Sequence, residues 1–358
     1  MRIKLPPAVT RLMNNLSMLR DHASRLRERL NPRRLTLARG RDYYGSRPKP
    51  AAVLLRRALV LALASVWLIS AGKLTAYLMD YVSSANASRE LRETYYAQEE
   101  PDAAAETAAP SAATSVPASP TAATVYLAGS ATAAPTAAVY LPQAQYPTNP
   151  SRVISSRFAK IRRQNSDIIG WLTIPDLIDE AVVQRDNEYY LRRDYRGYHN
   201  TNGAIFLEES CSLSSRPHTL ILYGHNMKTG AMFGSLRYYE TAAFYHNNPF
   251  ITFDTMYEDG RYVIFAVATV SIVPTEWDYL DFAGLSSTRI ASRQAALRQL
   301  RALSMYSGTV SVEADDQLLL LVTCKQDDSK RRVIAARRIR SDEDETILKR
   351  LVGASRKK

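Results

Sequence analysis

A series of short apolar segments between residues 168 and 339 most constrains the fold of this 358-residue chain. Each segment is four to twelve residues long and is bounded by polar or turn-forming residues, a pattern typical of short β-strands. The expected strands are 168–174, 181–184, 204–207, 219–223, 250–253, 262–273, 310–313, 318–323 and 333–339. Many short strands with few helices predict a β-barrel or a β-sandwich.

Helical patterns interrupt this series at a few places. Apolar residues at helical spacing predict helices over residues 153–165 and 288–305. Near the C-terminus, Ser341 is an expected N-cap and Gly353 lies just past the expected end of a last helix. We therefore expect a mainly β fold with a few peripheral helices.

Positive charge is concentrated at the N-terminus. The chain has a formal net charge of +12, and residues 1–57 hold fifteen basic and three acidic residues, so this arm carries all of it. No folded nucleic-acid reader or aromatic platform accompanies the charge, so no nucleic-acid partner is expected. Two interpretations of the arm remain: a disordered tail that fixes membrane topology, or a tail in which residues 23–30 form a helix on anionic lipid.

An apolar run over residues 58–79 follows the basic arm. A membrane-spanning helix needs roughly 20 residues, and this run reaches that length if Lys73 extends its ammonium group to the interface. The arginines before the run predict a single-pass plasma-membrane protein with a cytoplasmic N-terminus and an extracellular C-terminal region. A cleavable signal peptide, with a site at residues 85–87, is the alternative. Under both interpretations, the rest of the chain is exported across the membrane.

The chain divides by composition into six segments. Residues 99–150 are rich in Ala, Thr and Pro and hold too little large apolar surface to offset the entropy of ordering, so we expect a flexible stalk. The full expected division is a basic cytoplasmic tail (1–57), a signal anchor (58–79), a juxtamembrane helix (80–98), the stalk (99–150), a folded domain (151–345), and the end of the last helix with a basic tail (346–358).

Three reactive side chains lie at the ends of expected strands. His225 comes two residues after one strand, Cys324 directly follows another, and Arg332 directly precedes a third. Strand ends lie at the rim of a barrel, where a sheet meets a surface cleft. A thiol, an imidazole and a guanidinium together can perform acyl transfer as nucleophile, proton shuttle and anion stabiliser.

Each of these residues also has a structural interpretation. Cys324 could be a buried core cysteine, although the four residues after it are all polar or charged. His225 could be a structural histidine, although the glycine before it permits the close backbone approach of a crowded site. The arginine belongs to a basic triplet, for which a solvated run is the default. Strand alternation alone leaves Arg331 and Arg332 open.

The chain contains one other cysteine, Cys211. Outside the cell, a disulfide between Cys211 and Cys324 is conceivable, but it would abolish the nucleophile. Cys211 lies in a serine-rich turn rather than at a matching strand end. We therefore predict that Cys211 is a bystander thiol.

The motifs around these residues resemble the active-site signature of sortases, the cysteine transpeptidases of Gram-positive surfaces. His225 lies in Tyr-Gly-His-Asn-Met, Cys324 in Thr-Cys, and Arg332 before a β-branched pair. Further blocks that resemble class B sortases follow in collinear order between about residues 151 and 340: 165–172, 181–191, 202–207 and 230–239. Several ordered blocks are far more specific than a lone Thr-Cys.

This resemblance implies a closed eight-stranded sortase-type β-barrel and a membrane-anchored transpeptidase. It implies that Cys324 attacks a Thr-X bond in the C-terminal sorting signal of a secreted protein. An amine of a peptidoglycan precursor, or a pilin lysine, would then resolve the thioester. His225 would be the general acid and base, and Arg332 would hold the substrate carbonyl. Residues implied to line the substrate site are Thr323, Tyr223 and Asn226. No metal or organic cofactor is implied.

Two positions depart from the class B pattern. Val322 stands where a small hydroxyl residue is frequent, and Lys325 stands where an acidic one is. Because of these departures, the sequence does not indicate which sorting motif the protein prefers. The sequence leaves two other functions open: an L,D-transpeptidase, whose Ser/Thr-His-Gly-Cys context is missing here, and a catalytically idle surface-binding barrel.

Overall fold

The computed structural model describes residues 50–97, 138–324 and 329–358, without the side chain of Cys324. Residues 1–49 of the expected basic tail and residues 99–137 of the expected stalk lie outside the described residues. The chain divides into two units, residues 1–78 and 79–358, which are described separately.

Helix α2 (Pro50–Tyr96) is long and apolar enough to cross a membrane, with a candidate span within Leu54–Tyr96 that contains an 18-residue window of mean hydropathy 1.8. In the first unit its large apolar side chains are exposed, including Trp67 at 69% and Ile69 at 61%. Exposed apolar surface of this kind is favourable in lipid and unfavourable in water. The helix therefore has the properties expected of an anchor over residues 58–79.

The described part of the second unit contains a closed β-barrel, with the strand order β1-β2-β3-β4-β7-β8-β6-β5. The strands are β1 (Ile168–Ile174), β2 (Ile178–Val183), β3 (Ile205–Leu207), β4 (Thr219–His225), β5 (Phe250–Thr255), β6 (Arg261–Ser271), β7 (Leu318–Cys324) and β8 (Lys330–Arg338). Closure satisfies the edges that an open sheet would expose. The predicted eight-stranded barrel is confirmed.

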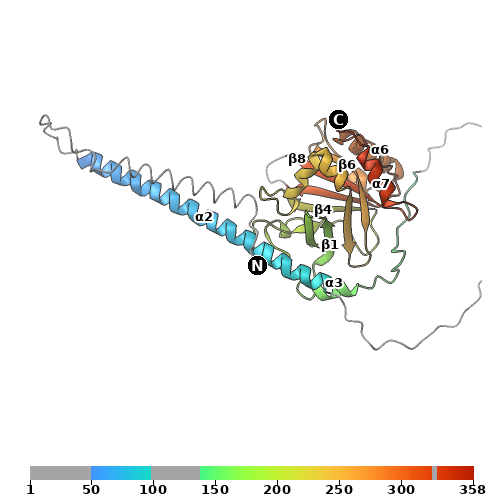
Figure 1. Cartoon of the computed structure of the whole chain (residues 1–358), viewed down its shortest axis with the longest axis horizontal. Helices are drawn as coiled ribbons and strands as arrows, with labels where there is room; N and C mark the ends of the chain where they lie inside the picture. The colour runs from blue at the N-terminus through green and yellow to red at the C-terminus, as the bar shows by residue number, and fades with distance from the viewer. Residues whose placement is uncertain (1–49, 98–137, 325–328) are drawn as a thin grey trace, which may run out of the picture. The chain divides into compact units, whose positions relative to one another are not determined.

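Short helices surround the barrel (Figure 1). They are α3 (Ser156–Ile161), η2 (Tyr189–Arg192), η3 (Phe233–Glu240), α4 (Ala242–Asn247), α5 (Phe282–Ser286), α6 (Ile290–Leu303) and α7 (Glu345–Gly353). Both α6 and α7 pack against β6, and α5 packs against α6. The expectation of a few peripheral helices is confirmed.

The central strands β4 and β7 run parallel and in register from Thr219↔Leu318 to His225↔Cys324. Their apolar runs are almost fully buried, which is typical of parallel strands covered on both faces. The connection between them must cross over the sheet, and it contains α5 and α6. Because the strands are parallel, His225 and Cys324 come to the same end of the barrel.

The C-terminal part of α2 packs on the outside of the barrel. Ala87, Leu91 and Tyr95 are buried in one cluster with Trp171. The Tyr95 ring stacks on the Trp171 ring with centroids 4.2 Å apart, and its hydroxyl donates to Asp254 Oδ2 at 3.0 Å. Residues 79–96 are therefore an integral part of the barrel unit.

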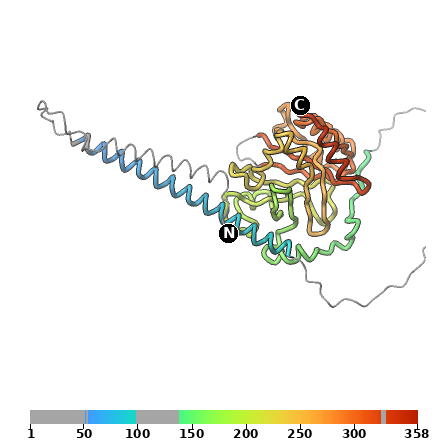
Figure 2. Tube along the Cα trace, in the orientation of Figure 1, coloured from blue at the N-terminus to red at the C-terminus, as the bar shows by residue number. Residues whose placement is uncertain are grey.

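Residues 138–150, which the composition assigns to the stalk, run along the outside of the barrel before α3 (Figure 2). Leu141 N donates to Thr288 O at 2.7 Å, and the Tyr146 hydroxyl donates to Leu213 O at 3.1 Å. Both side chains are buried. Two large apolar residues thus order a segment whose overall composition resembles a linker.

Two local expectations are wrong. Residues 310–313 form no strand, because Val310 is buried outside the barrel ladder and Arg337 Nε donates to the backbone oxygen of Ser311. The N-cap of the last helix is Asp344 rather than Ser341, since the Asp344 carboxylate accepts from two backbone N–H groups of the first turn. A carboxylate in this position also interacts favourably with the helix dipole.

Candidate active site

The parallel register of β4 and β7 sets His225 directly beside Cys324. Neighbouring strands lie about 4.8 Å apart, so the two backbones are adjacent at the rim of the barrel. The strand order thus joins residues that are about a hundred positions apart in sequence. The Cys324 side chain is outside the described part of the chain, so its position is defined here by its backbone.

The His225 ring is half-buried, and its Nε2 lies 2.6 Å from the backbone oxygen of Leu191 in η2. A carbonyl oxygen only accepts hydrogen bonds, so Nε2 carries the proton in this contact. In the neutral ring, Nδ1 is then the proton acceptor. The Leu191 contact therefore selects the tautomer and orients the ring.

Gly224, between Tyr223 and His225, lets η3 pack closely against the end of β4. A Cβ atom at Gly224 would lie 2.8 Å from the ring of Phe233, which begins η3 and is fully buried. Any larger residue would push η3 away from the barrel. Because side chains alternate along a strand, Tyr223 and His225 belong to the face opposite η3. Tyr223 there contacts Phe206, with ring centroids 5.5 Å apart.

The antiparallel register of β7 and β8 separates the two candidate arginines. Val322 lies opposite Val333. Val322↔Val333 is the last pair of this ladder, and the same register extended by two residues would set Thr323 opposite Arg332 and position 324 opposite Arg331. Opposite residues share a face of the sheet, and successive residues alternate between faces. In the extended register, Arg331 falls on the face of position 324 and His225, whereas Arg332 falls on the opposite face.

The contacts of Arg332 agree with this assignment. Its backbone N donates to Thr323 Oγ1 at 3.0 Å, and its Nε donates to Glu240 Oε1 at 3.0 Å. Nη2 contacts the same carboxylate oxygen. Glu240 ends η3, the helix that packs on the Gly224 side of the sheet. Arg332 is thus held toward η3 and away from the His225 face.

The basic triplet is not a solvated run. Lys330 Nζ donates to both carboxylate oxygens of Asp278, at 2.6 and 2.8 Å, and also contacts Glu276. Arg331 Nη1 donates to the Lys330 backbone oxygen at 3.0 Å. Asp278 and Glu276 lie 52 and 54 residues before Lys330 in the chain, so the sequence around the triplet does not indicate these ion pairs.

The three residues expected to line the substrate site lie in different surroundings. Thr323 is buried, and its hydroxyl accepts from the backbone of Arg332, which is a structural contact. Tyr223 is half-buried on the His225 face. Asn226 is half-buried and pairs with Met232 in an isolated bridge, which closes a loop directly after His225.

Cys211 is a free thiol, buried against the barrel. Burial raises the pKa of its thiol to about 11, and the sulfur contacts the backbone oxygen of Thr219 at 3.5 Å. A thiol that stays protonated is a poor nucleophile. Within the described ranges, no group of three or more His, Cys, Asp or Glu side chains is arranged to hold a metal ion.

Gly203→Ala is expected to reduce activity at least tenfold through His225. Gly203 has a φ of +64°, and an added Cβ would lie 2.7 Å from the Leu191 oxygen that orients His225. The measurement is the pH dependence of turnover, which reports on the histidine. Gly197→Ala is the matched control, because its φ is +85° but its added Cβ would meet only the Tyr189 hydroxyl at 3.2 Å. Equal losses in both variants would show that backbone strain alone is responsible.

Comparisons with known proteins agree on one family. The Sortase domain family matches residues 172–339. Sortase B of Listeria monocytogenes is 30% identical over 179 residues, covering 49% of this chain and 70% of the relative. Sortase B of Staphylococcus aureus is 28% identical over 176 residues, covering 48% and 69%. The crystal structure of sortase B from Bacillus anthracis in complex with AAEK1 has a similar fold, with a TM-score of 0.51 and 24% identity over 74% of this chain and 99% of that chain.

Proposed function

Because this chain belongs to the sortase family and is of class B, we propose that it is a membrane-anchored cysteine transpeptidase that acts on the C-terminal sorting signals of secreted proteins. The pairing of His225 with Cys324 carries this proposal, since it juxtaposes a general acid–base with a nucleophile at a barrel rim. The acceptor is an amine of a peptidoglycan precursor or a pilin lysine.

The reaction proceeds in two acyl transfers. The Cys324 thiolate attacks the carbonyl carbon of the Thr-X bond, a C–S bond forms, and the C–N bond breaks as His225 protonates the departing amine. The incoming amine then loses a proton to His225 and attacks the thioester, so a C–N bond forms and the thiolate leaves. Nucleophile and protons both come from the chain, so no cofactor enters the proposal.

We assign the stabilisation of the substrate carbonyl to Arg331, although the resemblance to sortases favoured Arg332 and strand alternation left the two arginines open. The support is the register, by which Arg331 falls on the face of position 324 and Arg332 on the face of η3. A guanidinium on the same face as the nucleophile meets the requirement that a donor point at the developing negative charge. Tyr223 and Asn226, near His225, remain the residues proposed to contact substrate.

We also propose that residues 58–79 of α2 anchor the protein in the plasma membrane, with the N-terminus in the cytoplasm and the barrel outside. The support is the exposed apolar surface of this helix and the basic residues that precede it.

The test uses the full-length protein in detergent micelles with a panel of candidate sorting peptides and hydroxylamine. We expect cleavage at the Thr-X bond, a hydroxamate product, and an acyl-enzyme mass on Cys324. Cys324→Ala should be inactive, whereas Cys211→Ala, the matched thiol control, should keep its activity. Cleavage by Cys324→Ala would reject Cys324 as the nucleophile. No cleavage by the wild-type protein across a broad panel would reject the proposal and favour an idle barrel.

A further inference from the structure

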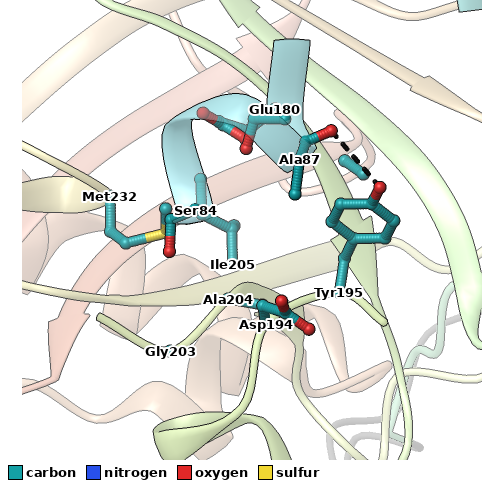
Figure 3. Close-up of a pocket in the computed structure, with 11 residues that line it drawn as sticks. Ser84, Ala87, Glu180, Asp194, Tyr195, Gly203, Ala204, Ile205 and Met232 are labelled. Carbon is teal, nitrogen blue, oxygen red and sulfur yellow. Dashed lines mark hydrogen bonds between the residues drawn. The ribbon is translucent and has the colours of Figure 1, made fainter. Parts of the chain in front are cut away.

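A cavity of about 270 Å³ lies between α2 and the barrel and has no part in the reaction described above. Its wall includes Ser84 and Ser88 of α2, Glu180 of β2, Asn202 before β3, and residues 229–232. A smaller adjoining cavity of about 20 Å³ shares Ser84, Ser88, Glu180 and Met232 (Figure 3). Since Asn226 pairs with Met232, the wall formed by residues 229–232 belongs to the loop that directly follows His225.

Asn202 supplies an unused hydrogen-bond acceptor at this cavity. The residue is 1% exposed, and its Oδ1 has no hydrogen-bond partner among the described residues. Its Nδ2 donates to Ser84 Oγ at 3.4 Å, so the amide nitrogen is already engaged. Buried polar atoms are rarely left without a partner, which indicates that a hydrogen-bond donor is missing from this site.

Glu180 supplies a carboxyl group without an ion pair in the described part of the chain. The nearby Arg92 instead pairs with Asp179, with its Nε 2.7 Å from Oδ2. Figure 3 shows the carboxyl groups of Glu180 and Asp194 on opposite sides of the small cavity. Asp194 pairs with Arg196 at 2.7 Å. Asp179 and Asp194 are thus each in a direct ion pair, whereas Glu180 interacts with Ser88 and with the charge of Arg92 but forms no direct ion pair among the described residues.

The wall thus combines a carboxylate, an amide oxygen and serine hydroxyls, which together suit a ligand rich in donors. A divalent cation is disfavoured, because no described group of three acidic or imidazole side chains surrounds the space. A primary ammonium group has three N–H donors and one positive charge, which matches these acceptors.

We propose that this cavity binds the primary ammonium group of the amine acceptor and holds the acceptor beside the loop that directly follows His225 before transfer. Glu180, Asn202 Oδ1 and Ser84 receive its three N–H groups. This inference rests on the proposed transpeptidase function, in which an amine resolves the thioester. The volume of about 270 Å³ admits a short unbranched amine, such as the end of a peptide bridge or a lysine side chain.

Binding is expected to depend on pH in one direction. Burial raises the pKa of Glu180 to about 7, so the empty site is largely protonated at pH 6. The ammonium group needs the carboxylate, so the affinity for a lysine-type amine, which stays protonated throughout this range, should rise from pH 6 to pH 8. The charged groups facing this region are Arg92 from α2, Asp179 from β2, and the Asp194–Arg196 pair from the β2–β3 connection. Glu180→Gln should remove the pH dependence.

The direct test is calorimetric titration of the full-length Cys324→Ala protein in detergent micelles at pH 8. The probes are triglycine, which carries a peptide amine, cadaverine, which mimics a lysine side chain, and N-acetyl-triglycine, which lacks the ammonium group. We expect one or both amines to bind, with at least tenfold weaker binding in Glu180→Gln and no binding of the acetylated peptide. Glu93→Gln, on an exposed face one turn further along α2, should bind as the parent does. The better amine probe identifies the acceptor class.

A second measurement uses the active enzyme. Glu180→Gln should raise KM for the amine at least tenfold, with no change in the rate of thioester formation. Unchanged amine binding in Glu180→Gln, or equal binding of the acetylated peptide, would overturn the inference. Because the titration needs no catalysis, a failure of the proposed function would appear separately, as absent peptide cleavage by the wild-type protein.

Discussion

Replacing Arg331 with glutamine is expected to lower kcat/KM for sorting-peptide cleavage by about 100- to 1000-fold, the usual effect of losing one donor to a developing oxyanion. Arg332→Gln should stay within about tenfold of wild type, since Glu240 holds the Arg332 guanidinium away from the His225 face. The reason for the difference is the register: Arg331 shares the face of position 324, whereas Arg332 is held by Glu240 on the opposite face.

The measurement is the steady-state rate of peptide cleavage together with thermal unfolding of each variant. Glu240→Gln is the matched control, because it removes the partner of Arg332 without touching the His225 face. It should resemble Arg332→Gln in both activity and stability. If Arg332→Gln and Glu240→Gln lose activity while Arg331→Gln keeps it, the family resemblance indicated the right arginine and the register argument fails.

The choice between Arg331 and Arg332 shows what could not be predicted from the sequence. The pattern started the last strand at Val333, because three basic residues precede it and strands are expected to be apolar. The strand begins at Lys330 instead. Lys330 pairs with Asp278, and Arg332 pairs with Glu240. Such partners lie far away in the chain, so the charged residues looked like a loop. The face assignment depends on this extension.

Other elements were predictable because burial alone explains them. The runs that became β4 and β7 are apolar throughout, and a strand covered on both faces needs no other signal. The start of β2 was missed for the opposite reason. It contains Asp179 and Glu180, and these polar residues are accommodated by Arg92 and by the cavity beside α2. The pattern of apolar residues is therefore sufficient to predict the strands of the barrel. The charged ends of β2 and β8 can be located only from the tertiary structure.

Arg293→Met is expected to destabilise the barrel unit by about 3 to 5 kcal/mol, a large share of the stability of a typical domain. Arg293 in α6 is fully buried, and its guanidinium donates to the backbone oxygens of Ala314, Asp316, His218 and Leu285 and to Thr219 Oγ1. Two of these oxygens have other donors: His218 O accepts from Leu318 N, and Leu285 O accepts from Thr219 Oγ1. The substitution would leave Ala314 O and Asp316 O without the donor they now have.

One effect opposes this loss. Burial lowers the pKa of Arg293 to about 10, so the cation is disfavoured, although it remains charged at neutral pH. Methionine avoids that cost. We expect the orphaned carbonyls to outweigh this gain, since each buried unsatisfied group costs about 1 to 3 kcal/mol and two are created.

The measurement is denaturant unfolding of the full-length protein, with Arg298→Met on the exposed face of α6 as the matched control. Arg293→Lys should recover part of the loss, because it restores the charge but offers fewer donors. The guanidinium bonds the segments that begin β4 and β7, so weakening it should also loosen the register that aligns His225 with Cys324 at the far ends of those strands. Activity should then fall at temperatures below the unfolding transition. A stability within 1 kcal/mol of wild type for Arg293→Met would show that packing alone holds the two strands together.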